Sequence, residues 1–432
     1  MTPNLNRRDF VKATALGTLA TTLASPRALG ANERLRAGYI GVANRGGQLI
    51  QATLPHKDRC EIVAVCDVHA PTRDEWATKL GATAHNDYRE LLDRKDIDVI
   101  FIATPDHWHA LQTIQACDAG KDVYCEKPLS QTIVEGRKMV EAARRNKRIV
   151  QVGLHRRSSK MYQQLHEVVS AGTIGKVTAA HCYRINDMWP RGIGNAADQD
   201  PPKDLDWEMW LGPRAYRPYR PTITPYRFRW WDGYSSQLGN WGVHFFDVIR
   251  WMLDEEVPVA VSAHGGKFAI EDDRTIPDTM QVIFEFASGR LLFFAQYEAS
   301  GTPLFNGDID LRGTQGLIYA REDGFEVLPE SRGQFQAKDA PRAEPQTQSA
   351  PADNADLTSA HIGNFLDCVK TRETPHCDVE EGHRSTTFAH LANIALKTQS
   401  RLQWDPTTEK FINNDAANAL LHYEYREPWK LG

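Results

Sequence analysis

The sequence of 432 residues has little of what marks several common classes of protein. It has no excess of positive charge, since 51 Lys and Arg face 56 Asp and Glu, and this balance argues against a general electrostatic attraction to nucleic acid or to an anionic membrane. It has seven cysteines, an odd number without any C-x-x-C pair, which matches neither a disulfide framework nor a zinc site. We therefore expect a small-molecule substrate, no metal and no nucleic-acid partner.

The N-terminus offers only a mild apolar stretch, residues 13–24, which is too short to span a bilayer as a helix. Arg7 and Arg8 precede this stretch, a cleavage site can follow Ala28-Leu29-Gly30, and no cysteine that could carry a lipid precedes Cys60. Residues 1–31 therefore resemble a twin-arginine export signal, the alternative being an unstructured start with a chance pair of arginines. The prediction is a protein without a membrane anchor, exported by the twin-arginine machinery to the periplasm.

Residues 34–155 alternate short apolar runs with amphipathic segments. The expected strands are residues 36–43, 61–68, 98–104, 122–125 and 148–154, and the expected helices are residues 47–54, 72–80, 88–93, 109–119 and 133–146. Alternation of this kind is typical of a parallel sheet with helices on both faces, which binds its ligand at the carboxyl ends of the strands. The pattern predicts a doubly wound Rossmann domain.

The first strand runs into Gly41-Val42-Ala43-Asn44-Arg45-Gly46, a G-x-A-x-x-G version of the dinucleotide fingerprint. Small residues in this turn let backbone N–H groups and a helix N-terminus approach a pyrophosphate. The next strand ends in Asp67, whose carboxylate can accept hydrogen bonds from ribose hydroxyls and repel a 2′-phosphate. The pattern favours NAD over NADP, although Arg45 leaves NADP open, and an unrelated turn beside a surface aspartate is the alternative.

Two later segments are more specific. Thr104-Pro105-Asp106-His107-Trp108-His109 ends the third of these strands and opens a helix, and Glu126-Lys127-Pro128 ends the next. The ordered set GVANRG, AVCDV, ATPDHWH and CEKPL resembles the glucose–fructose oxidoreductase/inositol dehydrogenase (Gfo/Idh/MocA) family over nearly all of residues 36–155. The resemblance implies that the first segment lines the nicotinamide half of the cofactor site and that Glu126 lies beside the cofactor. His107 and His109 are equally well explained as local hydrogen-bonding residues.

The same resemblance implies that Lys127 points at the reacting carbon and hydroxyl of the substrate. Physical chemistry agrees, because an ammonium near a cationic nicotinamide is disfavoured, which lowers its pKa and suits it to proton transfer. A structural lysine that caps a strand end is the alternative. We expect Lys127 to be catalytic.

Residues 156–432 show a different periodicity and form the expected substrate domain. A helix is predicted over 161–171, strands over 176–185, 258–267, 279–288, 290–299 and 307–313, and helices over 359–370 and 382–399. The resemblance implies an open, mostly antiparallel sheet, and its open face favours a homodimer or homotetramer. Residues 331–357 are rich in Pro, Ala and Gln and are predicted to form a mobile loop.

Seven of the eleven tryptophans lie in or just after residues 186–239, a long stretch without clear periodicity. A loop of this length inside a compact domain is usually functional. Aromatic rings can stack on the apolar faces of sugars, and guanidinium groups can bind hydroxyls or carboxylates, so Arg229 and Trp241 are expected to bind substrate. The alternative is that individual tryptophans fill a core or a subunit interface.

The segment that begins at Asn240 carries the second catalytic signal. Related dehydrogenases have a D-x-x-x-H pair one helical turn apart, and His244 matches the histidine, an acid or base for the substrate hydroxyl. Asn240 stands where those relatives have aspartate, and an amide cannot take a proton. Asp247 then orients His244, or Asn240 only binds substrate; a core histidine is the remaining alternative.

Three functions follow from these residues. The leading hypothesis is hydride transfer between NAD and a hydroxyl of a sugar, glycoside or polyol. A second is redox-neutral cleavage of a glycoside by oxidation and elimination, and a third is an NAD-binding sensor without catalysis. Because an exported enzyme has no network to recycle free NADH, we expect tightly bound NAD, held by the fingerprint turn and covered by Trp108.

Overall fold

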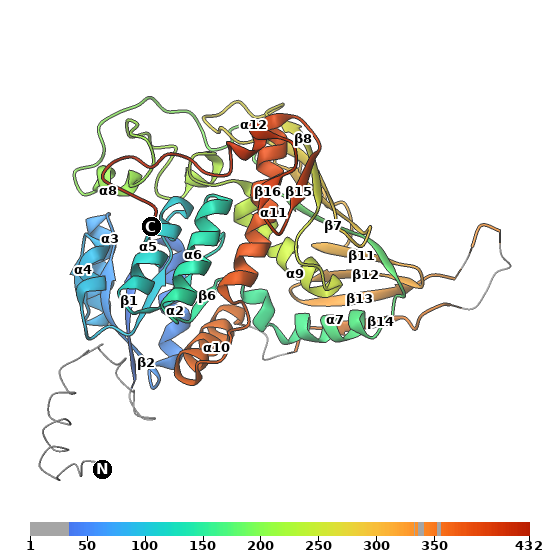
Figure 1. Ribbon diagram of the computed structural model, residues 1–432, viewed down its shortest axis with the longest axis horizontal. Helices are drawn as coiled ribbons and strands as arrows, with labels where there is room; N and C mark the ends of the chain where they lie inside the picture. Colours follow the sequence, from blue (N-terminus) through green and yellow to red (C-terminus); the bar gives the residue numbers. More distant parts are fainter. Residues whose placement is uncertain (1–33, 332, 336–340, 352–355) are drawn as a thin grey trace, which may run out of the picture. The chain divides into compact units, whose positions relative to one another are not determined.

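The computed structural model describes residues 34–331, 333–335, 341–351 and 356–432 (Figure 1). The predicted export signal, residues 1–31, lies outside this part of the chain. Within the described residues, no helix is long and apolar enough to cross a membrane.

The first domain is built on a six-stranded parallel sheet with the order β3-β2-β1-β4-β5-β6 (Figure 1). Its strands are β1 (Leu35–Ile40), β2 (Cys60–Cys66), β3 (Thr83–His85), β4 (Val99–Ile102), β5 (Asp122–Cys125) and β6 (Val150–Val152). Its helices are α2 (Asn44–Thr53), α3 (Ala70–Leu80), α4 (Tyr88–Asp93), α5 (Asp106–Asp118) and α6 (Ile133–Arg145). The predicted Rossmann domain is confirmed. Strand β3 was not predicted, because it is short and largely exposed and shows no apolar run.

The order of the strands reverses between β1 and β4, which places a ligand crevice at their carboxyl ends. Strand β4, VIFI, is buried along its whole length, as expected of a central parallel strand covered on both faces. Helix α6 begins with a capping box in which Thr132 and Glu135 bond each other's backbone N–H groups, so its start is fixed locally. These local signals explain why the sequence predicted this domain well.

The second domain contains a ten-stranded sheet with the order β14-β13-β12-β11-β7-β10-β9-β8-β15-β16. Its strands are β7 (Val177–Ile185), β8 (Ala260–Gly266), β9 (Thr279–Glu285), β10 (Leu291–Tyr297), β11 (Ile309–Gly313), β12 (Gly316–Arg321), β13 (Gly324–Pro329), β14 (Gln346–Ser349), β15 (Leu402–Asp405) and β16 (Lys410–Phe411). Only β7 and β10 pair in parallel; the other pairs are antiparallel, as the resemblance implied.

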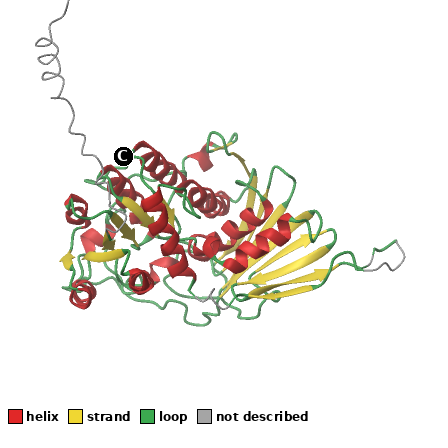
Figure 2. Ribbon diagram, turned by 90° about the horizontal axis from the view of Figure 1, so that it is seen from below, coloured by secondary structure: helices red, strands yellow, loops and turns green. Residues whose placement is uncertain are grey.

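Helices pack on one face of this sheet, as Figure 2 shows. The shared apolar core joins the sheet to α7 (Lys160–Ser170), α9 (Val243–Leu253) and α11 (Val379–Thr398). On the other face, Ile283 keeps 38% of its surface exposed in the single chain. The expected homo-oligomer stays a prediction.

Five strands of this domain, β12 to β16, were not predicted, and one of them corrects an expectation. Residues 331–357 were predicted to be a mobile loop, but Gln346–Ser349 forms β14, which pairs with β13 at the edge of the sheet. Strand β14 is polar and mostly exposed, so backbone hydrogen bonds hold it in the sheet and its sequence shows no hydrophobic pattern.

The C-terminal part of the chain returns to the first domain, so a division at residue 155 does not separate two cores. Helix α10 (Leu357–Thr371) packs against α2 and the 3-10 turn after β6, and its Phe365 contacts Tyr124 of β5. Gln151 Nε2 donates to the carbonyl of His361 at 2.8 Å, and Arg372 pairs with Asp122 at 2.6 Å. The dinucleotide domain is therefore braced by the last quarter of the sequence.

Residues 186–239 contain the short helix α8 (Trp207–Leu211) and fold around a small core of their own. That core buries Trp207, Trp210, Trp230 and Trp231, so for these four the core interpretation is confirmed. The ion pairs that Arg274 forms with Asp272 and Glu298 are completely buried beneath it, and Trp230 Nε1 donates to Glu298 at 3.0 Å. The aromatic segment is thereby fixed to the end of β10.

Candidate active site

The fingerprint turn is closed by two glycines that no other residue can replace without a shift. Gly41 has φ +79°, and a Cβ there would lie 2.9 Å from the backbone of Ala103. A Cβ on Gly46 would lie 1.9 Å from the carbonyl oxygen of Gly41. The turn leaves Ala43 and Asn44 exposed at the N-terminus of α2, a cradle that fits a pyrophosphate.

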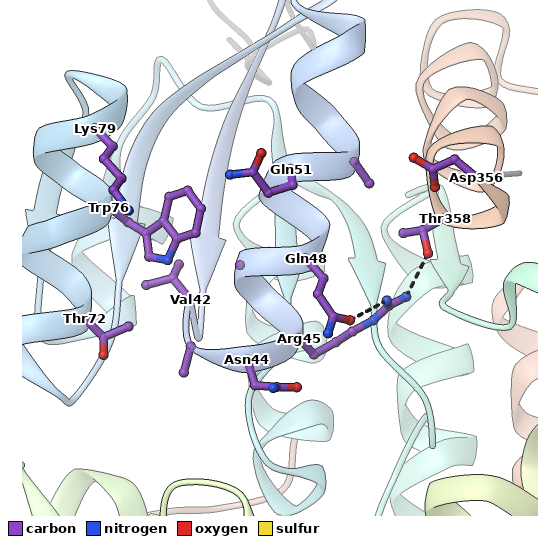
Figure 3. A pocket seen from close by; sticks show the side chains of 13 residues that line it. Val42, Asn44, Arg45, Gln48, Gln51, Thr72, Trp76, Lys79, Asp356 and Thr358 are labelled. Carbon is purple, nitrogen blue, oxygen red and sulfur yellow. Dashed lines mark hydrogen bonds between the residues drawn. The ribbon is translucent and has the colours of Figure 1, made fainter.

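Figure 3 shows the groove that opens beside this turn, with a volume of about 690 Å³. Helix α2 lines it, together with Trp76 of α3 and Thr358 of α10. Arg45 lies at its edge, where its guanidinium donates to Gln48 at 3.1 Å and to Thr358 at 3.5 Å. The C-terminal helix α10 thus contributes to the groove, which sequence patterns did not reveal.

Asp67 lies directly beneath the fingerprint turn. Its Oδ2 accepts from Val42 N at 2.8 Å and its Oδ1 accepts from His69 N at 2.9 Å. Burial raises the pKa of Asp67, while these backbone amides favour the charged form. Each oxygen keeps a lone pair for a ribose hydroxyl, so the carboxylate can brace the turn and also bind the nucleotide.

The segment that opens α5 divides into site residues and packing residues. Thr104 Oγ1 donates to Gln112 at 2.8 Å, and Pro105 sets the start of the helix at the carboxyl end of β4. Asp106 is buried, accepts from Ser235 Oγ at 2.5 Å, and has its pKa raised by burial. These three residues lie at the predicted nicotinamide edge of the sheet.

The side chains of His107, Trp108 and His109 are buried and bond to backbone carbonyls, and their contact with the cofactor stays a prediction. His107 is fully buried, its Nε2 lies 2.9 Å from the carbonyl of Trp210, and its Nδ1 is buried without a hydrogen-bond partner among the described residues. Trp108 is 3% exposed and its Nε1 donates to the same carbonyl at 3.1 Å. Burial lowers the pKa of His107 to about 3, so it is a neutral residue that ties α5 to α8.

His109 has a structural role at the same edge. Its Nδ1 lies 2.7 Å from the carbonyl oxygen of Pro128 and its Nε2 lies 2.9 Å from that of Thr104. Burial opposes the charged form, but the neighbouring Cys125 and Asp106 and the carbonyl of Pro128 favour it and raise the pKa to about 10. As an imidazolium, His109 donates to both carbonyls and holds together the two loops that carry the site.

The Glu126-Lys127 pair connects the fingerprint turn to the second domain. Glu126 accepts from Arg45 Nε at 2.8 Å, which occupies Arg45 with a carboxylate rather than leaving it free for a 2′-phosphate. Lys127 Nζ donates to the carbonyl oxygen of Asn240 at 2.5 Å and lies 3.3 Å from Asn240 Oδ1. Burial lowers the pKa of Lys127 to about 8, and the charge of Arg229 acts in the same direction.

His244 follows Asn240 by one helical turn, on α9 after the π-helical turn η4 (Leu238–Gly242). Its Nδ1 is buried without a hydrogen-bond partner in the described part of the chain, and burial holds its pKa well below the usual range. The idea that Asp247 orients His244 is wrong, because Asp247 pairs with Arg157 at 2.9 Å and accepts from Ser385. His244 is thus a neutral ring with a free polar atom beside Lys127.

Two residues of this cluster were missed from the sequence. His155 follows β6, its ring lies 5.2 Å from that of His244, and its Nδ1 is also buried without a partner among the described residues. Its position at the carboxyl end of a parallel strand was the available signal. Arg184, at the end of β7, stacks on Trp241 with its guanidinium carbon 3.8 Å from the ring centroid. No sequence motif marks it.

Arg229 and Trp241 lie near Lys127 and His244, and their binding of substrate stays a prediction. The Arg229 guanidinium carbon is 4.2 Å from the ring centroid of Tyr226, and its charge acts on Lys127 and Asp106. The Trp241 ring is 6.2 Å from that of His244. Across the described residues, no three His, Cys, Asp or Glu side chains gather as metal ligands.

A doubly wound dinucleotide domain with a lysine at the carboxyl end of β5, facing a histidine of an antiparallel substrate domain, defines the class of two-domain NAD-dependent oxidoreductases. Residues 35–154 match the Gfo/Idh/MocA family described as an oxidoreductase family with an NAD-binding Rossmann fold. Residues 160–320 and 332–431 match its C-terminal alpha/beta domain. The chain belongs to the Gfo/Idh/MocA oxidoreductase family, and its cofactor is NAD.

Relatives of known name agree with this family. Inositol 2-dehydrogenase of Salmonella typhimurium is 35% identical over 150 residues, 34% of this chain and 45% of the relative, so the match spans less than half of that enzyme. Myo-inositol 2-dehydrogenase of Thermotoga maritima is 27% identical over 371 residues, 84% of this chain and 96% of the relative. A levoglucosan dehydrogenase in complex with NADH shares the fold, with a TM-score of 0.67, 18% identity and coverage of 86% and 99% of the two chains.

Replacing Asp67 tests its two roles separately. We expect Asp67→Ser to weaken NAD binding about tenfold and to narrow the preference over NADP, because both the brace on Val42 and the repulsion of a 2′-phosphate are lost. Asp67→Asn keeps an acceptor for Val42 and should narrow the preference with a smaller loss of NAD affinity. Fluorescence titration with both nucleotides measures this, and an unchanged NAD/NADP ratio in both variants would contradict the assignment.

Proposed function

We propose that the protein transfers a hydride between NAD and a secondary hydroxyl of a polyol or sugar. The observation that carries this proposal is the hydrogen bond from Lys127, in the dinucleotide domain, to Asn240, in the substrate domain. This bond places a lysine of lowered pKa near His244. The named inositol dehydrogenases that share the family support a polyol or sugar as substrate.

The residues present fit the cofactor, since Gly41 and Gly46 keep the pyrophosphate cradle open and Asp67 lies below it. When bound, NAD supplies the acceptor for the hydride. The protein then has to remove the hydroxyl proton, and the Lys127 amine can accept it because a pKa of about 8 leaves roughly a tenth of the amine unprotonated at pH 7, and more at higher pH. His244, held neutral by burial, can bond the same hydroxyl through Nδ1 and orient it.

Asn240 is a positioning residue in this scheme. Its carbonyl oxygen accepts one Lys127 N–H and sets the direction of the amine, while its neutral side chain leaves the lysine pKa low. The D-x-x-x-H relay of related enzymes is therefore replaced by a lysine whose proton affinity is governed by burial. The presence of both Lys127 and His244 favours this dehydrogenase over a redox-neutral lyase and over a sensor.

We expect Lys127→Ala to bind NAD but to turn over roughly 10²–10⁴ times more slowly, the usual loss for an acid–base group. Steady-state rates with myo-inositol and glucose, together with an NAD titration, measure the two effects. Lys138→Ala, on the outer surface of α6 where Lys138 pairs with Glu141, is the matched control and should keep the wild-type rate. A near-normal rate for Lys127→Ala would remove this lysine from the reaction.

The pH profile should report the lysine directly. Because the unprotonated amine accepts the proton, kcat/KM for oxidation should rise with pH and level off above about 8. Asn240→Asp places a carboxylate about 3 Å from the ammonium, which favours the charged form of the lysine. The rising limb of the profile, where kcat/KM increases with pH, should therefore move up by about one pH unit or more. Asn240→Ser keeps the backbone acceptor and adds no charge, so its limb should stay near the wild-type position. A rising limb that does not shift in Asn240→Asp would contradict the role of Lys127.

We also propose that the protein is exported by the twin-arginine route with NAD already bound. Arg7, Arg8 and the apolar stretch after them support export, and the closed fingerprint turn supports slow release. Protein collected from the periplasm without added nucleotide and then denatured should release about one NAD(H) per chain, and Arg7→Lys with Arg8→Lys should retain the protein in the cytoplasm. Periplasmic protein without nucleotide, or export of the double variant, would contradict the proposal.

A further inference from the structure

Two arginines beside the site have no carboxylate of their own. Arg184 lies on β7, two residues after Cys182 on the same helix-covered face of the sheet, and its Nε is buried without a hydrogen-bond partner among the described residues. Arg229 is held between the rings of Tyr226 and Phe228, and its NH1 donates only to the carbonyl of Tyr226 at 3.0 Å. Within the part of the chain that the structure describes, neither guanidinium has an ion-pair partner within 4 Å.

The nearest carboxylates are already bound to other groups. Glu126 pairs with Arg45 at 2.8 Å, Asp106 accepts from Ser235, and Glu298 pairs with Arg274 at 2.5 Å. Asp308, the remaining acidic residue that acts on Arg184, lies 3.4 Å from Arg156. These carboxylates act on Arg184 and Arg229 only from a distance.

Apart from these paired carboxylates, the groups around Lys127 are neutral or positive. Lys127 contacts the amide of Asn240 rather than a carboxylate, and its pKa is lowered partly by the charge of Arg229. Burial also lowers the pKa of Arg184 and of Arg229, which means that the protein disfavours both charges where they stand. Taking a cation out of water without a partner costs free energy, and a ligand anion would recover it.

Both arginines and the catalytic cluster border the same place. Arg184 covers one face of Trp241, whose neighbours along the chain are Asn240 and, one turn on, His244. The Tyr226 ring packs on Arg229, and Tyr226 is also near enough to Arg184 to favour its charged form. A substrate whose hydroxyl reaches Lys127 can therefore extend a second group toward the two guanidiniums.

Resting on the proposed function, we propose that the substrate is an anionic sugar or polyol, with a carboxylate or phosphate that Arg229 and Arg184 bind while its hydroxyl faces Lys127. Guanidinium forks match the oxygens of both groups, and a hexuronic acid and a sugar phosphate are the two sources of the same chemistry. Arg184 and Arg229 then determine specificity, and Trp241 holds Arg184 in place.

The test compares glucuronate and glucose 6-phosphate with glucose and myo-inositol, using the NAD-loaded full chain for rates and the NADH-loaded chain for calorimetric binding. We expect kcat/KM and affinity for an anionic sugar to exceed those for glucose by about 10- to 100-fold, as for hydrogen bonds to a charged group. Arg229→Gln and Arg184→Gln should each reduce this ratio at least about tenfold. Arg227→Gln, an exposed neighbour on the same 3-10 helix, is the matched control and should leave the ratio unchanged.

The outcomes separate the two proposals. Preference for glucuronate or for the phosphate supports the inference and identifies the anion. Turnover of glucose or myo-inositol without preference for either anion, or with equal losses for all sugars in both arginine variants, overturns the inference and leaves the dehydrogenase intact. Arg229-dependent binding of an anionic sugar without any turnover supports the inference and overturns the proposed function.

Discussion

The hydrogen bond of 2.5 Å from Lys127 Nζ to the carbonyl oxygen of Asn240 is the contact on which the site depends. Lys127 stands at the carboxyl end of β5 in the dinucleotide domain, and Asn240 belongs to the π-helical turn that opens α9 in the substrate domain. One bond therefore sets the direction of the amine and the position of the helix that carries His244. The π-helical turn is the kind of local irregularity that often marks functional sites, because it re-aims side chains without changing the helix axis.

Further contacts fix the positions of the segments that carry Lys127 and Asn240. The ion pair of Arg45 with Glu126 fixes the residue before Lys127 to the fingerprint turn, and His109 bonds the loops that follow β4 and β5. On the other side, the buried pairs of Arg274 with Asp272 and Glu298 anchor the aromatic segment that presents Arg229. Breaking a buried ion pair by removing one partner is far more costly than breaking a surface pair, so these groups favour one fixed arrangement of the site.

Sequence reasoning predicted the elements whose signals are local. Fully buried β-branched runs such as β4 and the capping box at Thr132 show their structure in a few consecutive residues, and the fingerprint glycines need a specific backbone geometry. Lys127 and His244 were found because each follows a short motif at a strand end or helix start. The resemblance to the family supplied the prediction that these motifs lie at one site, because spacing alone does not show which strand ends lie together.

The misses share a physical cause, which is that their partners are remote in the chain. The Trp108 indole donates to carbonyls of α8, about 100 residues later in the chain, which no local pattern could predict. Asp247 lies one turn from His244, yet it forms its ion pair with Arg157, 90 residues earlier in the chain. Strand β14 pairs through its backbone with β13 and carries no hydrophobic pattern. Contacts of this kind depend on tertiary structure, and propensity does not encode them.

Two buried cations of the chain are compensated by the protein itself, whereas Arg184, like Arg217 over the ring of Trp231, has a buried Nε without a partner among the described residues. Lys121 is 4% exposed and donates to the carbonyls of Arg94 and Ile97 at 2.6 and 2.7 Å, and Arg274 is fully buried between two carboxylates. Each of these charges receives full compensation from the protein itself. Arg184 receives a ring, which stabilises a guanidinium by roughly 1–2 kcal/mol and offers no acceptor for Nε. A cation held in place but left without an acceptor, beside an amine poised for proton transfer, is arranged for an anion that arrives with the substrate.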